Sequence, residues 1–276
     1  MNGNPEAGMK PATKTISVLV AAFKAQDWIA DCLDAVFAQD LPDGWRLEVL
    51  VGIDGCDDTL QRIQSIRQPF RDMPLDIVHL RQNQGTYVTF NTLMLYATGD
   101  LICRFDADDV MRPDYLAAQI RTIETGVDMT LTWSIYTDTA LKPVPVYSKK
   151  NGLEDANGHC RIGWEGQFVI RREVWERLGG FQAWRTSADT DFLNRVKAAG
   201  FRQIVLEQFL YFRRIHGNSL TSHPDSNFQS PMRLSVEQLI VEYSLQYQTG
   251  ERDVALKPEH AIDHARLIPA TIGSPP

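Results

Sequence analysis

Cysteine is scarce in this sequence, and its spacing excludes the two kinds of site that cysteine usually builds. The 276 residues include four cysteines, Cys32, Cys56, Cys103 and Cys160, and none of them stands in a C-x-x-C pair. A structural zinc site or a disulfide framework is therefore not expected, and the composition fits a reducing cytosol. We predict a cytoplasmic protein.

Positive charge is also in short supply, and long apolar runs are absent. The net charge of −7 argues against nucleic acid or an anionic bilayer as the main partner. No stretch approaches the roughly 20 apolar residues of a membrane-spanning helix, and residues 1–14 lack the apolar core of a signal peptide. We therefore expect no nucleic-acid partner and no transmembrane segment. Peripheral contact with the inner face of a membrane stays open.

The sequence does contain short apolar runs that alternate with amphipathic stretches. With 43% hydrophobic residues, the chain can bury one large core. The apolar runs predict strands over 15–23, 46–54, 75–80, 100–106 and 129–138. Helical periodicity predicts helices over 25–39, 57–68, 86–99 and 113–124. This alternation predicts an α/β fold with a mainly parallel sheet flanked by helices.

The second half of the chain is less regular. Helices are predicted over 172–181, 187–201 and 231–250, and strand-like segments over 202–216. Residues 142–167, which include Lys149 and Lys150, read as a long loop or flap. We expect a flexible tail over 1–14, a main domain over 15–221, and a C-terminal helix and tail over 222–276, loose from about residue 256.

The helix predicted over 231–250 is amphipathic. Its polar face has little basic character, so docking on the domain is favoured over docking on a membrane. The face expected to dock carries Val236, Leu239, Ile240 and Tyr243.

Acidic side chains follow two of the predicted strands. Asp54 ends the second strand, and the segment CRFDADDVMRPDYL (103–116) places Asp106, Asp108 and Asp109 at the end of the fourth. Carboxylates this close repel one another, so the cluster needs an explanation. The three alternatives are a solvated turn, a helix cap and a binding site for a divalent cation. Because ligands bind outside the carboxyl ends of strands in such sheets, these positions suit a metal site.

Five segments, in this order, resemble a family 2 glycosyltransferase, an inverting enzyme of the GT-A fold that uses nucleotide sugars. They are ISVLVAAFKAQDWIADCLDAVFAQ (16–39), GIDGCDDT (52–59), NQGTYVTFN (83–91), GDLICRFDADDVMRPDYL (99–116) and SADTDFLNRVKAAGF (187–201). The resemblance covers roughly residues 15–221. The sequence departs from the family pattern after the first strand, where Ala21-Ala22-Phe23-Lys24 replaces Pro-Thr-Tyr-Asn, and in the last segment, where Ala188 replaces Glu.

The resemblance implies a donor site with a divalent cation, Mn²⁺ or Mg²⁺. It assigns Asp106 to the nucleotide and to the metal, and Asp108 to the metal. We expect Asp109 to support or cap the next helix. It places His216 near the metal and Arg213 near the diphosphate, although a solvated basic turn explains residues 212–221 equally well. The remaining donor contacts that it implies are Ala21, Phe23, Asp54 and Asn91. Core packing is the alternative for Phe23, and a simple turn for Asp54.

Inversion requires a base that takes a proton from the acceptor hydroxyl. The resemblance assigns this role to Asp189, with Asp191 as the second acid. Asp191 is the alternative base, and a helix cap is the alternative for both. The residues considered for the acceptor side are Trp133, Trp164 and Glu165.

The resemblance implies metal-dependent transfer of a sugar from a nucleotide-diphosphate sugar, UDP-linked, to a glycan or lipid-linked acceptor, as in bacterial surface polysaccharide synthesis. Two alternatives stay open: a sugar-phosphate nucleotidyltransferase, and a nucleotide-sugar-binding domain that has lost catalysis. The first usually has a glycine-rich loop after its first strand, and the loop AAFKAQ (21–26) contains no glycine.

Overall fold

The computed structural model describes residues 13–66, 73–144, 153–154, 160–161 and 166–267. Its main sheet has nine strands in the order β11-β3-β2-β1-β4-β9-β6-β10-β5. Six of them run parallel to one another: β1 (Lys14–Ala22), β2 (Trp45–Asp54), β3 (Leu75–Leu80), β4 (Leu101–Asp106), β6 (Met129–Thr137) and β10 (Gln203–Arg214). Three short strands run antiparallel to their neighbours: β5 (Val110–Met111), β9 (Phe168–Arg171) and β11 (His264–Leu267). The pair β7 (Leu153–Glu154) and β8 (Cys160–Arg161) forms a separate two-stranded sheet.

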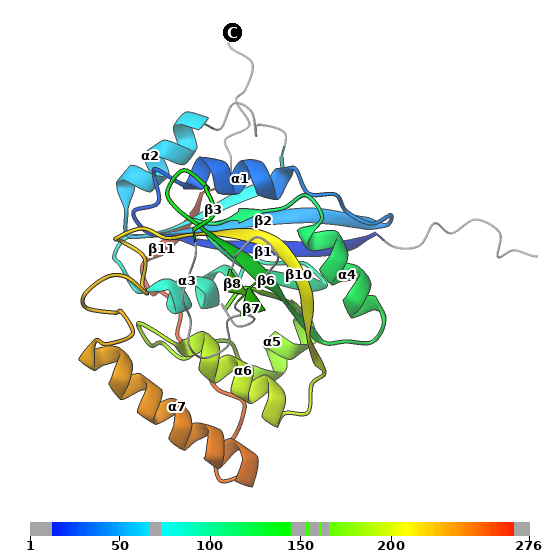
Figure 1. The fold of residues 1–276 in the computed structure, drawn as a ribbon, viewed down its shortest axis with the longest axis vertical. Coiled ribbons are helices and arrows are strands. Elements are labelled where there is room, and N and C mark those ends of the chain that lie inside the picture. Colours follow the sequence, from blue (N-terminus) through cyan, green and yellow to red (C-terminus); the bar gives the residue numbers. More distant parts are fainter. Residues whose placement is uncertain (1–12, 67–72, 145–152, 155–159, 162–165, 268–276) are drawn as a thin grey trace, which may run out of the picture.

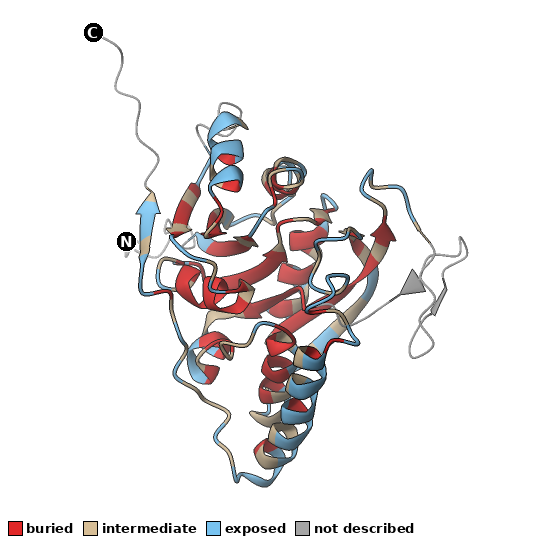
Figure 2. Ribbon diagram, turned by 90° about the vertical axis from the view of Figure 1, so that its left-hand side faces the viewer, coloured by how far each residue is buried: buried red, intermediate tan, exposed pale blue. Residues whose placement is uncertain are grey.

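Helices cover both faces of the main sheet (Figure 1). One face carries α1 (Ile29–Phe37), α2 (Asp57–Ile66) and α4 (Tyr115–Glu124), and the other carries α3 (Thr86–Leu93), α5 (Arg172–Leu178) and α6 (Ala188–Ala198). Because side chains alternate along a strand, Val18 and Val20 of β1 join the core under the first group, whereas Leu19 joins the core under the second. The central strands are accordingly buried on both faces (Figure 2), and the predicted α/β fold is confirmed.

The register of the central strands brings their carboxyl ends level. Ala21 near the end of β1 pairs with Gly52 of β2 on one side and with Asp106 of β4 on the other. Residues that follow these three strands therefore share one edge of the sheet, which is where a ligand crevice is expected.

The strand β9 was not predicted from the sequence. It lies antiparallel between β4 and β6, so it separates two strands that remain parallel to each other. Its four residues are too few to show a strand period, and its place depends on the two neighbours that hydrogen-bond to it.

The helix α7 (Pro231–Thr249) packs on α6 and extends away from the sheet (Figure 1). Its buried residues are Arg233, Ile240 and Tyr247. Leu239, which was predicted to lie on the docking face, is 37% exposed, so that part of the prediction is wrong. In the part of the chain that the structure describes, no helix combines the length and the apolar character that crossing a membrane requires.

The expectation of a loose segment from about residue 256 is wrong for residues 264–267. These residues form β11, which pairs with β3 and adds an edge strand to the sheet. Before it, Ala261 is buried, and its N–H donates a hydrogen bond to Thr92 Oγ1 at 2.9 Å. The weak periodicity of this segment does not indicate a strand. The segment becomes a strand because the edge of β3 offers backbone hydrogen-bonding partners.

Candidate functional site

One cleft gathers most of the residues predicted from the sequence. It lies at the carboxyl ends of β1, β2 and β4, is bounded by the start of α6 and by residues 213–233, and has a volume of about 470 Å³. The predicted site residues that line it are Ala21, Phe23, Asp54, Asp106, Asp108, Asp189, Arg213 and His216.

Phe23 and Asp54 contribute to this lining in different ways. The Phe23 side chain is 45% exposed, so its ring offers a face for stacking. Asp54 is buried, and its carboxylate oxygens accept hydrogen bonds from the backbone N–H groups of Gln84 and Gly85 at 2.6 and 2.9 Å. Burial raises the pKa of Asp54, and these two hydrogen bonds oppose that shift. Asp54 therefore holds the loop before α3 against the cleft.

The strand β4 ends at Asp106, and the chain turns directly after it. The Asp109 N–H donates to the Asp106 carbonyl at 3.3 Å, and this turn lets Asp106 and Asp108 line the same cleft. Asp108 Oδ2 lies 2.8 Å from His216 Nε2, and Asp106 Oδ1 lies 2.9 Å from Arg104 Nη2. Burial raises the pKa of Asp106 to about 6, although the charge of Arg104 opposes this shift.

The pair of Asp108 and His216 fits a divalent cation that draws its other ligands from a substrate. Mg²⁺ and Mn²⁺ commonly take one or two carboxylates together with phosphate oxygens and water, and imidazole is an accepted further ligand. Across the described ranges, no group of three or more His, Cys, Asp or Glu side chains forms a ready cage for a metal. The arrangement suits a cation held jointly by protein and diphosphate, with Asp106 as the second carboxylate.

Asp109 was expected to support or cap the next helix, and this expectation is wrong. Its hydrogen bonds go to residues outside that helix. Its side chain is buried, accepts a hydrogen bond from the Arg214 N–H at 2.9 Å and also accepts one from Gln167 Nε2. Burial, followed by the charges of Asp108 and Asp106, raises its pKa well above the usual range. Asp109 thus ties the end of β4 to the end of β10.

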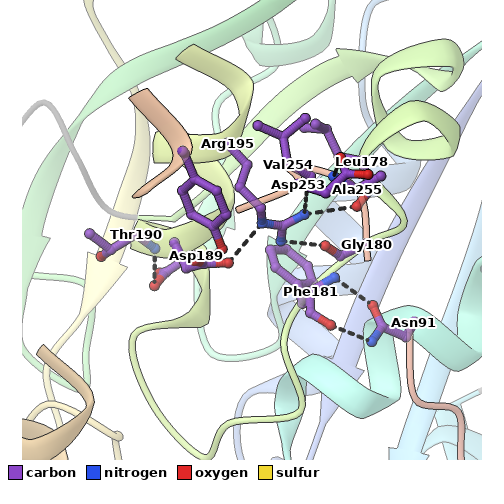
Figure 3. A network of polar contacts seen from close by, with 12 residues as sticks. Asn91, Leu178, Gly180, Phe181, Asp189, Thr190, Arg195, Asp253, Val254 and Ala255 are labelled. Atoms are coloured by element: carbon purple, nitrogen blue, oxygen red, sulfur yellow. Dashed lines mark hydrogen bonds and ion pairs between the residues drawn. The ribbon is translucent and has the colours of Figure 1, made fainter. Parts of the chain in front are cut away.

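Asp189 lies in the first turn of α6, and its side chain lines the cleft. Its Oδ1 accepts a hydrogen bond from the Thr190 N–H at 2.9 Å (Figure 3). Burial raises the pKa of Tyr87 well above its ordinary value, and the nearby charge of Asp189 adds to the shift. Tyr87 therefore lies beside Asp189 in the cleft.

Asp191 points into the protein core, so its predicted place in the catalytic site is wrong. Its Oδ2 lies 2.8 Å from Arg195 Nε, and its Oδ1 accepts a hydrogen bond from the Tyr247 hydroxyl at 3.0 Å. Arg195 in turn donates to backbone carbonyl groups around it (Figure 3). Residues two apart on a helix lie about 200° apart around its axis, so Asp189 and Asp191 cannot face the same side.

We expect Arg195→Met to lower the free energy of unfolding by about 3–5 kcal/mol, because the Asp191 carboxylate is then buried without its cation. Urea unfolding followed by circular dichroism measures this change. Lys14→Met is the matched control, since it breaks an exposed ion pair with Glu124, and it should cost about 1 kcal/mol or less. Equal losses in the two variants would contradict a structural role for the buried pair.

Asn91 also lies outside the cleft lining, so its predicted contact with the donor is wrong. Its side chain is buried and exchanges two hydrogen bonds of 2.9 Å with the backbone of Phe181 (Figure 3). It donates a further hydrogen bond to the Glu259 carbonyl at 3.1 Å. Asn91 therefore joins α3 to two distant segments of the chain.

Two arginines at the end of β10 line the cleft beside the carboxylates. Arg213 Nη1 donates to the Tyr136 hydroxyl at 2.9 Å. Arg214 is buried, pairs with Asp31 at 2.9 Å, and lies 4.5 Å from the ring of Trp28. Arginine beside a cleft of this kind suits the charge of a diphosphate.

Of the three residues considered for the acceptor side, Trp133 does not line this cleft. Trp133 lines a separate hollow with Phe209, their ring centroids 5.5 Å apart. Trp164 and Glu165 lie outside the described residues, as do Lys149 and Lys150 of the predicted flap.

Cleft residues that were missed in the sequence include Tyr87, Arg104 and Arg233. Arg104 could have been recognised as the single positive charge inside the apolar strand LICRFD. Arg233 of α7 donates to the Ser226 carbonyl at 2.7 Å and to Ser187 Oγ at 3.1 Å, so it joins the segment after β10 to the start of α6. No sequence signal identifies that contact, because it depends on how α7 docks.

Comparison with known proteins agrees with this arrangement. The family model described as glycosyl transferase family 2 matches residues 17–209. An uncharacterized glycosyltransferase of Nostoc sp. is 26% identical over 270 residues, which cover 86% of this chain and 78% of that protein. The putative teichuronic acid biosynthesis glycosyltransferase TuaG of Bacillus subtilis is 29% identical over 107 residues, which cover 38% of this chain and 40% of TuaG.

Two solved structures share the fold at low sequence identity. Residues 1–349 of S. aureus TarS, in complex with UDP-GlcNAc, superpose with a TM-score of 0.64 at 20% identity, covering 86% of this chain and 71% of that one. The mannosyltransferase PcManGT of Pyrobaculum calidifontis, in complex with GDP-Man and Mn²⁺, gives a TM-score of 0.60 at 18% identity, covering 87% and 74%.

Proposed function

Because this chain belongs to glycosyl transferase family 2, and is therefore a glycosyltransferase, we propose that it transfers a sugar from a UDP-linked donor to a hydroxyl of a glycan or lipid-linked acceptor. The transfer inverts the anomeric carbon and uses Mn²⁺ or Mg²⁺. The donor and cation are supported by the UDP-GlcNAc in TarS and by the GDP-Man and Mn²⁺ in PcManGT. The relative named for teichuronic acid biosynthesis supports an acceptor in bacterial surface polysaccharide synthesis.

The observation that carries this proposal is the presence of two different acidic groups in one cleft. Asp108 is paired with His216, and Asp189 lies at the start of α6 beside Tyr87. An inverting transfer needs these two functions at the same time: charge neutralisation at the leaving diphosphate, and a base at the attacking hydroxyl.

In this mechanism Asp189 accepts the proton of the acceptor hydroxyl while the oxygen attacks the anomeric carbon. The bond between that carbon and the diphosphate oxygen breaks, and nucleoside diphosphate leaves with the bonding electrons. A cation held by Asp108 and His216, with Asp106 beside it, supplies Lewis-acid stabilisation of the diphosphate when bound. Arg213 adds positive charge near the same group, and Phe23 offers its exposed face to the uracil base.

We further propose that the enzyme acts in the cytoplasm. It would contact the inner face of the membrane, where a lipid-linked acceptor would lie. The support is chemical: Cys32, Cys56 and Cys103 are free and buried, which fits a reducing compartment.

A donor panel tests the proposed function. The full chain is mixed with Mn²⁺ and with UDP- and GDP-sugars in turn, and the release of nucleoside diphosphate is measured with and without candidate oligosaccharide acceptors. We expect release that depends on a UDP-sugar and rises with acceptor, and NMR of the product should show the opposite anomer. Formation of a nucleotide sugar from sugar phosphate and UTP would instead indicate a nucleotidyltransferase, and binding without turnover would indicate an inactive domain.

A further inference from the structure

Arg104 is a buried arginine whose hydrogen-bonding capacity is only partly used. It lies on β4 two residues before Asp106, so both side chains point to the same face of the sheet. Its Nη2 pairs with Asp106, and its guanidinium lies 4.9 Å from the ring of Phe90, which fixes its plane. Its side chain is only 5% exposed, and in the described part of the chain Nε and Nη1 have no hydrogen-bond partner. Buried donors without partners are uncommon and call for an explanation.

The unused side of this guanidinium faces Asp189. Gly166 shows how close the two groups are, because a Cβ built on it would lie 2.2 Å from Asp189 Oδ2 and 2.9 Å from Arg104 Nη1. These two atoms are therefore within about 5 Å of each other. Gly166 also has a φ of +73°, but its lack of a side chain matters here because any side chain would occupy the space of the carboxylate.

We propose that Arg104 is a positioning residue that holds Asp106 and Asp189 in their working places, and that Gly166 keeps open the gap in which Asp189 meets the guanidinium. This inference rests on the proposed function, in which Asp189 is the base. The guanidinium binds Asp106 directly through Nη2 and attracts Asp189 through Nη1, its other terminal nitrogen. Tyr87 of α3 also lines the cleft beside Asp189.

The arrangement explains how two carboxylates share one cleft with an anionic donor. Asp106, Asp189 and a diphosphate all carry negative charge, so without a buried cation they would push one another out of alignment. A fixed guanidinium between the carboxylates offsets this repulsion without relying on the donor or its metal. Misplacement of a reacting group by about 1 Å can cost on the order of 10²-fold in rate, so the orientation of Asp189 is the property that Arg104 and Gly166 should control.

Two variants test the proposal, and each has a distinct expected result. Gly166→Ala leaves Arg104 intact but pushes Asp189 aside, so we expect kcat to fall by about 10²-fold while UDP binding measured by calorimetry is unchanged. Arg104→Lys keeps the charge but loses the planar fork, so we expect a similar fall in kcat together with weaker UDP binding through Asp106. In the double variant the kcat losses should not multiply, because both act on the same carboxylate.

Gly200→Ala is the matched control, because Gly200 has a similar φ of +80° and no atom lies within 4 Å of a Cβ built on it. It should keep the wild-type kcat, and its melting temperature should fall less than that of Gly166→Ala, because its Cβ meets no neighbouring atom. The inference is overturned if Gly166→Ala and Arg104→Lys keep wild-type kcat, or if the two losses multiply, while Asp189→Asn is inactive. Wild-type turnover in Asp189→Asn would instead overturn the choice of base, and with it the proposed function of this carboxylate.

Discussion

Asp189→Asn is expected to lower kcat by about 10²–10⁴-fold, which is the usual contribution of a general base. The amide keeps the size of the side chain and retains an oxygen for the Thr190 N–H. It cannot accept the proton of an acceptor hydroxyl. Because Asp108 and His216 are unchanged in this variant, the affinity for UDP in the presence of Mn²⁺ should remain as in the wild type.

The measurement is a rate at saturating donor, with thermal melting to show that the variant is folded. Asp191→Asn is the comparison. It removes the charge that faces Arg195 in the core, so we expect its melting temperature to fall while the folded enzyme retains most of its turnover. An inactive Asp191→Asn beside an active Asp189→Asn would show that the base has been assigned to the wrong carboxylate.

These two aspartates show what the sequence can and cannot tell. Their spacing on a helix indicates that only one of them can face a given side. Which one faces the cleft depends on the buried partners of the other, and these are Arg195 in the same helix and Tyr247 from α7. The second partner is 56 residues away in the chain, so no local pattern identifies it.

The strand ends, in contrast, could be predicted because their signal is local in the sequence. Buried parallel strands read as continuous apolar runs, and the last polar residue of such a run marks the ligand edge of the sheet. This rule placed Asp54 and Asp106 at the cleft, and the turn after Asp106 brought Asp108 beside them.

The errors concern residues whose partners lie far away in the chain. Asn91 was expected to contact the donor, but its side chain is occupied by Phe181 and Glu259. The strand β11 was expected to be loose, but it completes the edge beside β3. In both cases tertiary contacts decide the outcome, and they override weak local preferences.

Removal of the divalent cation is expected to abolish transfer. A diphosphate leaves poorly while its charge is uncompensated. Asp106, Asp108 and Asp189 add negative charge to the same cleft and Arg214 is paired with Asp31, so Arg213 alone does not replace a cation. Exhaustive treatment with a chelator should therefore stop the release of UDP, and Mn²⁺ or Mg²⁺ should restore it. Full activity after chelation would contradict the metal-dependent mechanism.

Asp108→Ala should abolish the dependence of UDP binding on the divalent cation, because it removes a proposed ligand of that cation. In the wild type, calorimetry should show tighter UDP binding in Mn²⁺ than in chelator, because cation and diphosphate bind together. The variant should lose this difference and its activity together, while His216 is left without its partner at 2.8 Å. Asp43→Ala is the control, since it removes one carboxylate from an exposed position outside the cleft lining. If Asp108→Ala bound UDP with unchanged dependence on Mn²⁺, the cation would have to be held elsewhere, and Asp108 would serve only to hold His216 and the end of β10.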